Sequence, residues 1–166
     1  MKVRHAAFLA VLGMMSTGPM PAVAAAPPEP VSWTLAIEPA AATLKAGATL
    51  TAVVSAKLEP GWHVYGTQEL PDGPRPLRVA LTPPSRFVAK GALVCPEPER
   101  DMDEGFGQVT AFYRSEVTCK QIVGAAPSTK PGSHTLSIDI SFQACDGKMC
   151  LPARLVRLTK PVTLTK

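Results

Sequence analysis

The sequence predicts an all-β fold, a β-sandwich, from three observations. Short runs of alternating apolar and polar residues recur along most of the chain, and that period of two is the pattern of a strand with one buried face. Turn residues separate nearly all of these runs, and the chain contains 18 prolines, which disfavour helices. No window carries a long apolar stripe with the 3.6-residue period of an amphipathic helix.

The first 24 residues have the pattern of a cleavable export signal. Lys2 and Arg4 precede an apolar stretch over residues 6–15, and an Ala-Val-Ala cleavage pattern ends at residue 24. No later stretch reaches the roughly 18 to 20 apolar residues that a membrane-spanning helix needs. We therefore expect the mature chain to be exported to the periplasm and not to span the membrane.

Length and charge limit the remaining possibilities. Without Lys2 and Arg4, 15 basic residues remain beside 13 acidic ones, and the basic residues are scattered, which argues against a nucleic-acid partner. Residues 25–30 form a Pro- and Ala-rich lead that we expect to be disordered. We expect residues 31–166 to form one domain, because about 140 residues bury a core without needing disulfides.

Seven runs have the clearest strand pattern. Seven short strands separated by turns fit an immunoglobulin-like sandwich, although the cysteine positions do not match the core disulfide of antibody domains. In chain order the expected strands are 33–37, 49–58, 62–65, 77–81, 112–122, 135–144 and 151–164.

Two cysteines close a four-residue loop directly after the run 135–144. The apolar residues of this run occupy the even positions, which predicts that Cys145 lies on the solvent side with the odd ones. An Asp-Gly pair follows and supplies turn chemistry, and a hairpin brings facing Cα atoms within the roughly 4.4–6.8 Å that a disulfide needs. Cys145 and Cys150 can therefore close a small ring, which either exchanges with other thiols or only ties the hairpin.

The stretch 96–107 is acidic and shows no strand pattern, so we expect a flexible loop. Its single aromatic residue, Phe106, is flanked by glycines and has no local core to fill, which suits a lid. We expect Asp103 and Glu104 to be solvated charges of this loop.

Cys95 and Cys119 lie on either side of this loop. Their positions favour a structural disulfide that ties the two ends of the loop together. A second redox-active pair is the alternative interpretation.

Three segments, in the right order, resemble a known family. They are PGWHVYG at 60–66, DEGFG at 103–107 and FQACDGKMCLP at 142–152. With them, the chain from about Trp33 to Leu164 resembles the N-terminal periplasmic (alpha) domain of the thiol:disulfide interchange protein DsbD.

The resemblance implies an immunoglobulin-like domain with one redox-active pair, Cys145 and Cys150, and no bound cofactor. It implies that Phe106 caps the pair and that His63 and Tyr65 line the site. Such domains receive electrons from a membrane-embedded thiol carrier and pass them to periplasmic thioredoxin-like proteins, including those of cytochrome c biogenesis. The chain carries neither the membrane carrier nor the thioredoxin-like domain of DsbD, so we expect the carrier to act in trans. The chain would then be one component of a protein-disulfide reductase system.

Two alternative functions stay open at this point. The soft ligands of the chain suit Cu(I), so a copper-binding or copper-delivery module is possible, although their spacing matches no closed metal site and no zinc pattern is present. A non-catalytic interaction domain with the same fold is the other alternative. The candidate copper ligands are Met102, His134, Cys145, Met149 and Cys150.

Overall fold

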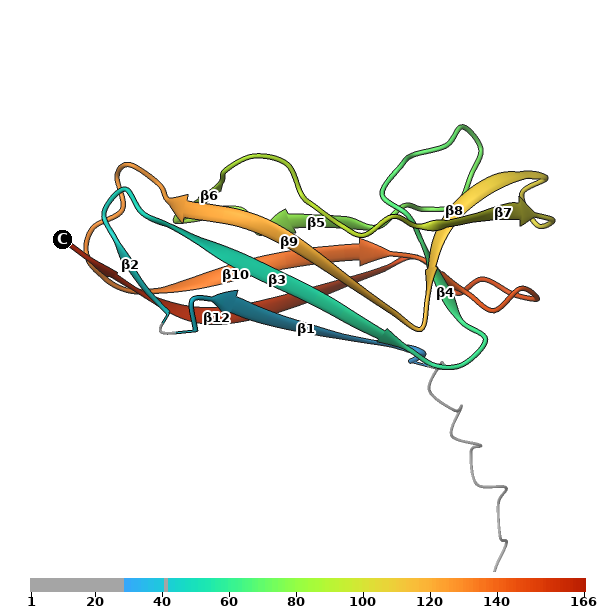
Figure 1. The fold of residues 1–166 in the computed structure, drawn as a ribbon, viewed down its shortest axis with the longest axis horizontal. Coiled ribbons are helices and arrows are strands. Elements are labelled where there is room, and N and C mark those ends of the chain that lie inside the picture. Colours follow the sequence, from blue (N-terminus) through green and yellow to red (C-terminus); the bar gives the residue numbers. More distant parts are fainter. Residues whose placement is uncertain (1–28, 41) are drawn as a thin grey trace, which may run out of the picture.

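The computed structural model describes residues 29–40 and 42–166, and this part of the chain folds into β-strands joined by turns and loops, with no helix that could span a membrane (Figure 1). The export signal expected over residues 1–24 lies outside the described residues. So does most of the lead expected to be disordered. Its last two residues are described: Pro30 is buried, and its carbonyl oxygen accepts a hydrogen bond from the N–H of Glu59 at 2.8 Å. Glu29 forms an ion pair with Arg154, so Glu29 and Pro30 both contact the rest of the domain.

Twelve strands form three sheets in the described part of the chain. The strands are β1 (Val31–Glu38), β2 (Thr43–Lys45), β3 (Thr49–Leu58), β4 (His63–Tyr65), β5 (Arg78–Leu81), β6 (Phe87–Ala89), β7 (Glu99–Asp103), β8 (Gln108–Arg114), β9 (Glu116–Ala125), β10 (Gly132–Phe142), β11 (Ala144–Cys145) and β12 (Arg154–Thr165).

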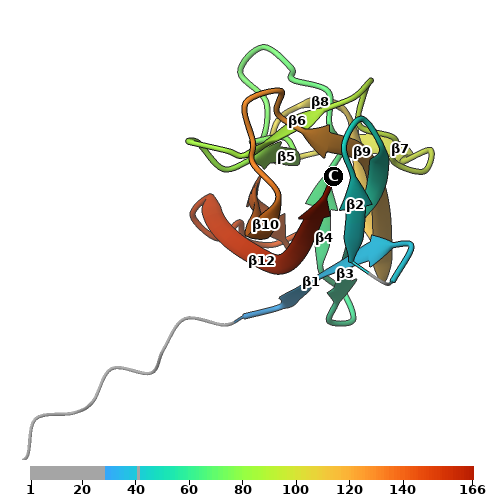
Figure 2. The ribbon, with the colours of Figure 1, turned by 90° about the vertical axis from the view of Figure 1, so that its left-hand side faces the viewer.

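Two of the sheets pack face to face and make the sandwich. Their strand orders are β1-β3-β9-β6 and β2-β12-β10-β5, and the pairing is antiparallel except between β12 and β2. The view along the long axis shows β1, β3 and β9 facing β10 and β12 across the core (Figure 2). The prediction of an all-β, immunoglobulin-like sandwich is confirmed.

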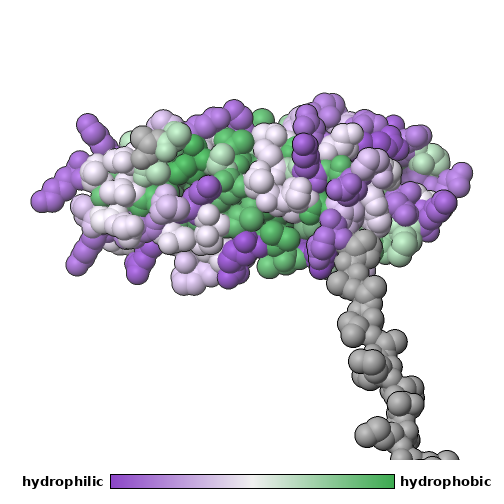
Figure 3. Space-filling view, turned by 90° about the horizontal axis from the view of Figure 1, so that it is seen from below, coloured by the Kyte–Doolittle hydropathy of each residue, from purple (hydrophilic) through white to green (hydrophobic). Residues whose placement is uncertain are grey.

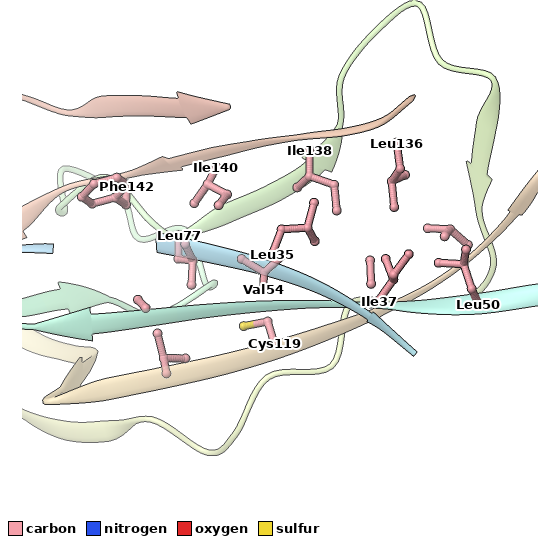
Figure 4. Packing of buried hydrophobic residues seen from close by; sticks show 14 of the residues in the cluster. Leu35, Ile37, Leu50, Val54, Leu77, Cys119, Leu136, Ile138, Ile140 and Phe142 are labelled. Carbon is pink, nitrogen blue, oxygen red and sulfur yellow. The ribbon is translucent and has the colours of Figure 1, made fainter. Parts of the chain in front are cut away.

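The core lies between these two sheets because their strands alternate as the sequence pattern predicts. On β10, Leu136, Ile138 and Ile140 are buried and point toward Leu35 of β1 and Val54 of β3 (Figure 4). Burying a side chain of this size stabilises the fold by roughly 1.5–3 kcal/mol relative to leaving it exposed. Seen from below, apolar residues show along the middle of the molecule, and polar residues cover both of its ends (Figure 3).

The third sheet has the order β11-β4-β8-β7 and lies at one end of the sandwich (Figure 1). It differs from the sequence prediction in two places. The single strand expected over 112–122 is two strands, β8 and β9, because Ser115 between them adopts φ 61° and the chain turns into another sheet. The stretch 96–107, expected to be a flexible loop, contains β7, which pairs with β8 as a hairpin. We call β7, β8 and their turn the cap hairpin.

Candidate functional site

One face of the third sheet brings the predicted site residues together. The antiparallel register places Cys145 of β11 opposite His63 of β4, and His63 opposite Arg114 of β8. Tyr65 stands two residues along β4 on the same face, opposite Phe112. Strands distant in sequence therefore place a sulfur, an imidazole and a phenol side by side.

A hollow of about 330 Å³ opens over this face. The cap hairpin forms one wall and the segment from Cys145 to Cys150 forms the other. Its lining consists of His63, Tyr65, Asp101, Met102, Asp103, Glu104, Gly105, Phe106, Thr110, Phe112, Arg114, Cys145, Gly147, Lys148, Met149 and Cys150.

Cys145 and Cys150 are disulfide-bonded and have very different exposure. Their Cα atoms are 4.1 Å apart, and Cys150 is exposed whereas Cys145 is only 2% exposed. The prediction that Cys145 faces solvent is wrong, because the alternation ends at Gln143, where the chain leaves β10 and enters the third sheet as β11. Ala144 then packs in the main core, while Cys145 packs against Tyr65 and Phe112.

The turn that joins the two cysteines is held by Asp146. Its Oδ1 accepts hydrogen bonds from the backbone N–H groups of Met149 at 2.8 Å and Lys148 at 2.9 Å. Its own N–H donates to the Met149 carbonyl at 3.1 Å, and Gly147 takes φ 83°, a left-handed conformation that suits glycine. The N–H groups of Met149 and Lys148 lower the pKa of Asp146 below its usual value, because they favour the charged form of the carboxylate that anchors the turn.

Tyr65 connects the disulfide to the cap hairpin. Its buried hydroxyl lies 2.9 Å from Asp103 Oδ2, 3.3 Å from Cys145 Sγ and 3.9 Å from Cys150 Sγ. Burial, and next the adjacent Asp103 carboxylate, raise the pKa of Tyr65 far above its ordinary value. The hydroxyl therefore keeps its hydrogen and is a donor beside both sulfurs.

Asp103 organises the turn of the cap hairpin. Its Oδ2 also accepts from the hydroxyl of buried Thr110 at 3.4 Å, and its Oδ1 accepts from the N–H groups of Gly105 at 3.0 Å and Phe106 at 3.3 Å. The expectation that Asp103 is a solvated loop charge is wrong, whereas Glu104 is exposed. An Asp two residues before a Gly is a recognised turn pattern, and that signal was present in the sequence.

Phe106 lies over the buried side of the disulfide. It is partly buried and packs against the cluster of Tyr65, Phe112 and Cys145. Its ring meets the Tyr65 ring edge to face at a centroid distance of 6.0 Å. The structure thus brings Phe106 to the cysteines on a short hairpin turn.

His63 lies beside two aromatic rings, one of which also carries a cation. Its ring centroid lies 5.1 Å from that of Tyr65 and 5.3 Å from that of Phe112, whose ring also carries the Arg114 guanidinium at 4.3 Å. Burial, and next the positive charge of Arg114, lower the pKa of His63 against the opposing pull of nearby carboxylates. Phe112 and Arg114 were not identified as site residues from the sequence, because only the β4–β8 register places them here.

Cys95 and Cys119 are joined in a second disulfide, with Cα atoms 4.2 Å apart. Cys119 lies on β9 and is 1% exposed, among the core residues in Figure 4. Next to it, Val94 and Lys120 form a backbone bridge with hydrogen bonds of 2.9 and 2.7 Å. This disulfide therefore joins the segment that leads into β7 to the central strand β9, and it does not line the hollow.

The candidate copper ligands are not all gathered in one place. Met102, Cys145, Met149 and Cys150 line the hollow, but His134 is near the start of β10 and its Nε2 lies 2.8 Å from the Lys130 carbonyl oxygen. Within residues 29–40 and 42–166, no group of three or more His, Cys, Asp and Glu side chains is arranged to hold a metal ion.

Thiol–disulfide exchange requires one sulfur that a partner can reach, and the exposed Cys150, bonded to the buried Cys145, meets that requirement. The family model described as thiol:disulfide interchange protein DsbD, N-terminal, matches residues 34–159. The chain belongs to this family of thiol–disulfide exchange domains.

Solved structures with a similar chain path have low sequence identity. The reduced DsbD N-terminal domain of Neisseria meningitidis aligns with a TM-score of 0.49 and 15% identity, over 68% of this chain and 77% of that one. The N-terminal periplasmic domain of ScsB from Proteus mirabilis aligns with a TM-score of 0.45 and 13% identity, over 80% of this chain and 45% of that one. The major pilin subunit BcpA of Bacillus cereus, in a D312A variant, aligns with a TM-score of 0.44 and 13% identity, over 82% of this chain and 40% of that one. No curated protein matches the chain by sequence.

Proposed function

We propose that the domain works in the periplasm and passes electrons through the Cys145–Cys150 pair. A membrane-embedded thiol carrier, acting in trans, supplies the electrons, and thioredoxin-like periplasmic proteins, including those that serve cytochrome c biogenesis, receive them. Membership of the family supports the choice of carrier and acceptors. The single observation that carries the proposal is the asymmetry of the pair, with an exposed Cys150 bonded to a buried Cys145 beneath Tyr65 and Phe106.

This asymmetry supports a different task for each sulfur. A thiolate of the donor attacks Cys150 Sγ, because Cys150 is the exposed member, and the bond to Cys145 breaks. The result is a mixed disulfide between donor and Cys150, with Cys145 as a thiolate that takes up a proton. The second thiol of the donor then attacks the donor sulfur of the mixed disulfide and releases Cys150. The donor leaves as a disulfide, and the domain holds two thiols, having gained two electrons and two protons.

The same steps in the opposite direction reduce an acceptor. Cys150, as a thiolate, attacks the disulfide of the thioredoxin-like protein, and Cys145 then attacks Cys150 Sγ to close the ring and release the reduced acceptor. The short turn held by Asp146 keeps the two sulfurs near each other for this resolving step.

Tyr65 stabilises Cys145 when it leaves. Its hydroxyl lies 3.3 Å from Cys145 Sγ, and a hydrogen bond to an anionic acceptor is stronger than one to a neutral sulfur. In the disulfide state that hydrogen is donated to Asp103 at the shorter distance of 2.9 Å. The phenol can therefore redirect its donor from the carboxylate to the sulfur as negative charge develops there.

Phe106 limits which molecules reach the buried sulfur. A free dithiol in an oxidising compartment would lose its electrons to any oxidant, so a cap that yields to a matching protein surface keeps exchange specific. The Asp103 carboxylate holds the cap turn and also accepts a hydrogen bond from Tyr65. The cap and the phenol beside the sulfurs therefore depend on the same carboxylate.

Stopped-flow fluorescence tests the proposal. The oxidised full chain is mixed with a reduced thioredoxin-like protein, and acid quenching followed by mass analysis identifies the mixed disulfide. We expect rapid exchange through a mixed disulfide at Cys150. If no exchange occurs with donors that reduce another family member under the same conditions, the chain is a non-catalytic interaction domain, and a Cu(I) titration of the reduced protein then tests the copper alternative.

A further inference from the structure

A proline-rich segment between β4 and β5, residues 67–76, closes on itself beside the site, and we call it the strap. Its two ends meet because Leu77 donates its N–H to the Gly66 carbonyl at 3.0 Å. Gly66 in turn donates to the Ala111 carbonyl of β8 at 2.7 Å, and Arg78 binds the Thr67 carbonyl at 2.9 Å. The strap is therefore fixed at its base to the third sheet and to β5.

Gln143 attaches the strap to residues 144–151, the segment closed by the Cys145–Cys150 bond, which we call the disulfide hairpin. Within the sequence Pro74-Arg75-Pro76 only Arg75 has a backbone N–H, and it donates to Gln143 Oε1 at 3.0 Å. The other half of the same amide, Nε2, donates to the Leu151 carbonyl at 3.3 Å. Gln143 thus bridges the strap and the residue that follows Cys150.

The strap is attached to the cap hairpin by Gln108. The Gln108 Nε2 donates to the Pro71 carbonyl at 3.3 Å. Gln108 is the first residue of β8, directly after the turn that carries Phe106, and it pairs with Asp103 across the hairpin. A Cβ added to Gly73 would lie 3.2 Å from Gln108 Nε2 and 2.8 Å from Leu70 Cβ, so the strap approaches this contact closely.

We propose that the strap, residues 67–76, couples the disulfide hairpin to the cap hairpin, with Gln143 as a positioning residue that holds Cys150 beside Cys145 and Gln108 as the attachment to the cap. This deepens the proposed function, because it assigns residues that control the same pair of cysteines. Gln143 touches neither sulfur and acts through Leu151 and Arg75.

The attachment at Gln143 has its effect in the reduced protein, where no S–S bond holds the two cysteines together. Once the S–S bond is open, the contacts that keep Cys150 near Cys145 include the Asp146 turn, the Leu151 N–H bond to the Ala144 carbonyl at 2.9 Å and the Gln143 amide. Because prolines restrict the strap backbone, a shift of the disulfide hairpin is passed to Pro71 and Gln108 instead of being absorbed locally.

The first experiment measures how strongly the fold favours the Cys145–Cys150 disulfide. The full chain is equilibrated with reduced and oxidised glutathione, thiols are alkylated, and peptide mass analysis reads this pair separately from Cys95–Cys119. Gln143→Met keeps the shape but removes both hydrogen bonds. We expect the equilibrium constant for disulfide formation to fall about 2- to 10-fold, the size of one neutral hydrogen bond, because only the bond to Leu151 acts on the segment that follows Cys150.

The matched control is Gln121→Met, because Gln121 also donates its amide to two carbonyls, those of Gly91 and Ile122, but on β9 away from the hollow. We expect Gln121→Met to lower the melting temperature and to leave the equilibrium constant unchanged. An unchanged constant in Gln143→Met, or an equal change in both variants, would overturn the positioning role.

The second experiment measures the coupling to the cap. The alkylation rate of buried Cys145 in the reduced protein reports cap opening. We expect Gln108→Met and Gln143→Met each to raise this alkylation rate about 2- to 10-fold. We expect the double variant to be alkylated no faster than either single variant, because either change alone disconnects the strap. Multiplying effects would mean that the two contacts are independent, and coupling through the strap would be wrong.

Two further variants keep the test decisive if a methionine variant folds poorly. Gln143→Glu retains the acceptor for Arg75 but loses the donor to Leu151, so we expect it to lower the disulfide equilibrium and to leave Cys145 alkylation slow. Gly73→Ala disturbs Gln108 from the strap side, and we expect it to speed alkylation. If neither variant changes the disulfide equilibrium constant or the alkylation rate of Cys145, the proposal fails. None of these measurements uses a protein partner, so their failure is distinguishable from failure of the proposed electron transfer.

Discussion

The two disulfides of this domain are nearly identical in span, and each has one buried cysteine, but the surroundings of the second cysteine differ. Their Cα–Cα distances are 4.1 Å and 4.2 Å. Cys145–Cys150 closes a short turn, has one exposed cysteine, and lies beside the hydroxyl of Tyr65 in a hollow. Cys95–Cys119 joins residues 24 apart in sequence and is packed into the core at Cys119. The residues around a disulfide, more than the geometry of the bond, therefore decide whether it is suited to thiol exchange or to stabilising the fold.

The loop lengths lead to the same division of roles. In the chain-entropy description, a bond between residues 24 apart restricts the unfolded chain by about 3.5 kcal/mol, and one between residues 5 apart by about 2 kcal/mol. The longer bond is the better stabiliser. The shorter one contributes less to folding and can be opened at smaller cost to the domain.

The largest expected effect is on exchange itself. Cys150→Ser removes the exposed sulfur, and we expect complete loss of exchange with a reduced thioredoxin-like protein, measured by stopped-flow fluorescence. The matched comparison is the Cys95→Ser/Cys119→Ser double variant, which should exchange at the rate of the unchanged protein. Loss of exchange in the double variant would show that the roles of the two disulfides have been assigned wrongly.

The converse effect is on stability. We expect Cys95→Ser/Cys119→Ser to lower the free energy of unfolding by roughly 3 kcal/mol, because the long loop of the unfolded chain is released and a core residue becomes polar. Urea denaturation followed by circular dichroism measures it. A change no larger than that of Cys145→Ser/Cys150→Ser would contradict the structural role.

A smaller effect is expected from the donor beside the leaving sulfur. Tyr65→Phe keeps the ring contacts with His63 and Phe106 but removes the hydroxyl. A hydrogen bond to a charged group is worth about 1.5–3 kcal/mol, so we expect exchange to slow about 10- to 100-fold. Stopped-flow rates over a range of pH test this, and an unchanged rate would remove Tyr65 from the mechanism.

The cap should have a smaller effect still. Phe106→Ala removes the edge-to-face contact with Tyr65, and since such contacts are worth about 0.5–1.5 kcal/mol, we expect the reduced pair to react with a small oxidant or alkylating agent about 2- to 10-fold faster. Val109→Ala, an exposed position on the same hairpin, is the control. Equal rates in the Phe106 variant and the unchanged protein would argue against a cap.

The smallest expected effect is a pH dependence at the exchange site. Burial and Arg114 lower the pKa of His63 in the folded state from its ordinary value of 6.5, so just below that pH the unfolded chain binds more protons than the folded one. Stability should therefore decline as pH falls below about 6.5, before the carboxylates protonate. His63→Gln should flatten this part of the profile in urea titrations, and an unaltered profile would contradict the assigned cause.

The local parts of the site could be predicted from the sequence, and the parts that depend on register could not. The pairing partner of Cys145 and the turn at Asp146 follow from spacing and turn chemistry. The burial of Cys145 could not be predicted, because the chain changes sheet at Gln143 and alternation stops there. Phe112 and Arg114 enter the site only through their pairing with β4.

By itself the sequence determined the all-β class, most of the strands of the sandwich and the family, because alternation, turn residues and short motifs are local and survive without knowledge of the partner strand. Only the tertiary structure decided which cysteine is exposed, that the acidic stretch is a hairpin whose Asp103 contacts Tyr65, and that a strap connects the two hairpins. These features depend on contacts between residues far apart in the chain, and a contact of that kind is set by how sheets pack and not by the identity of neighbouring residues.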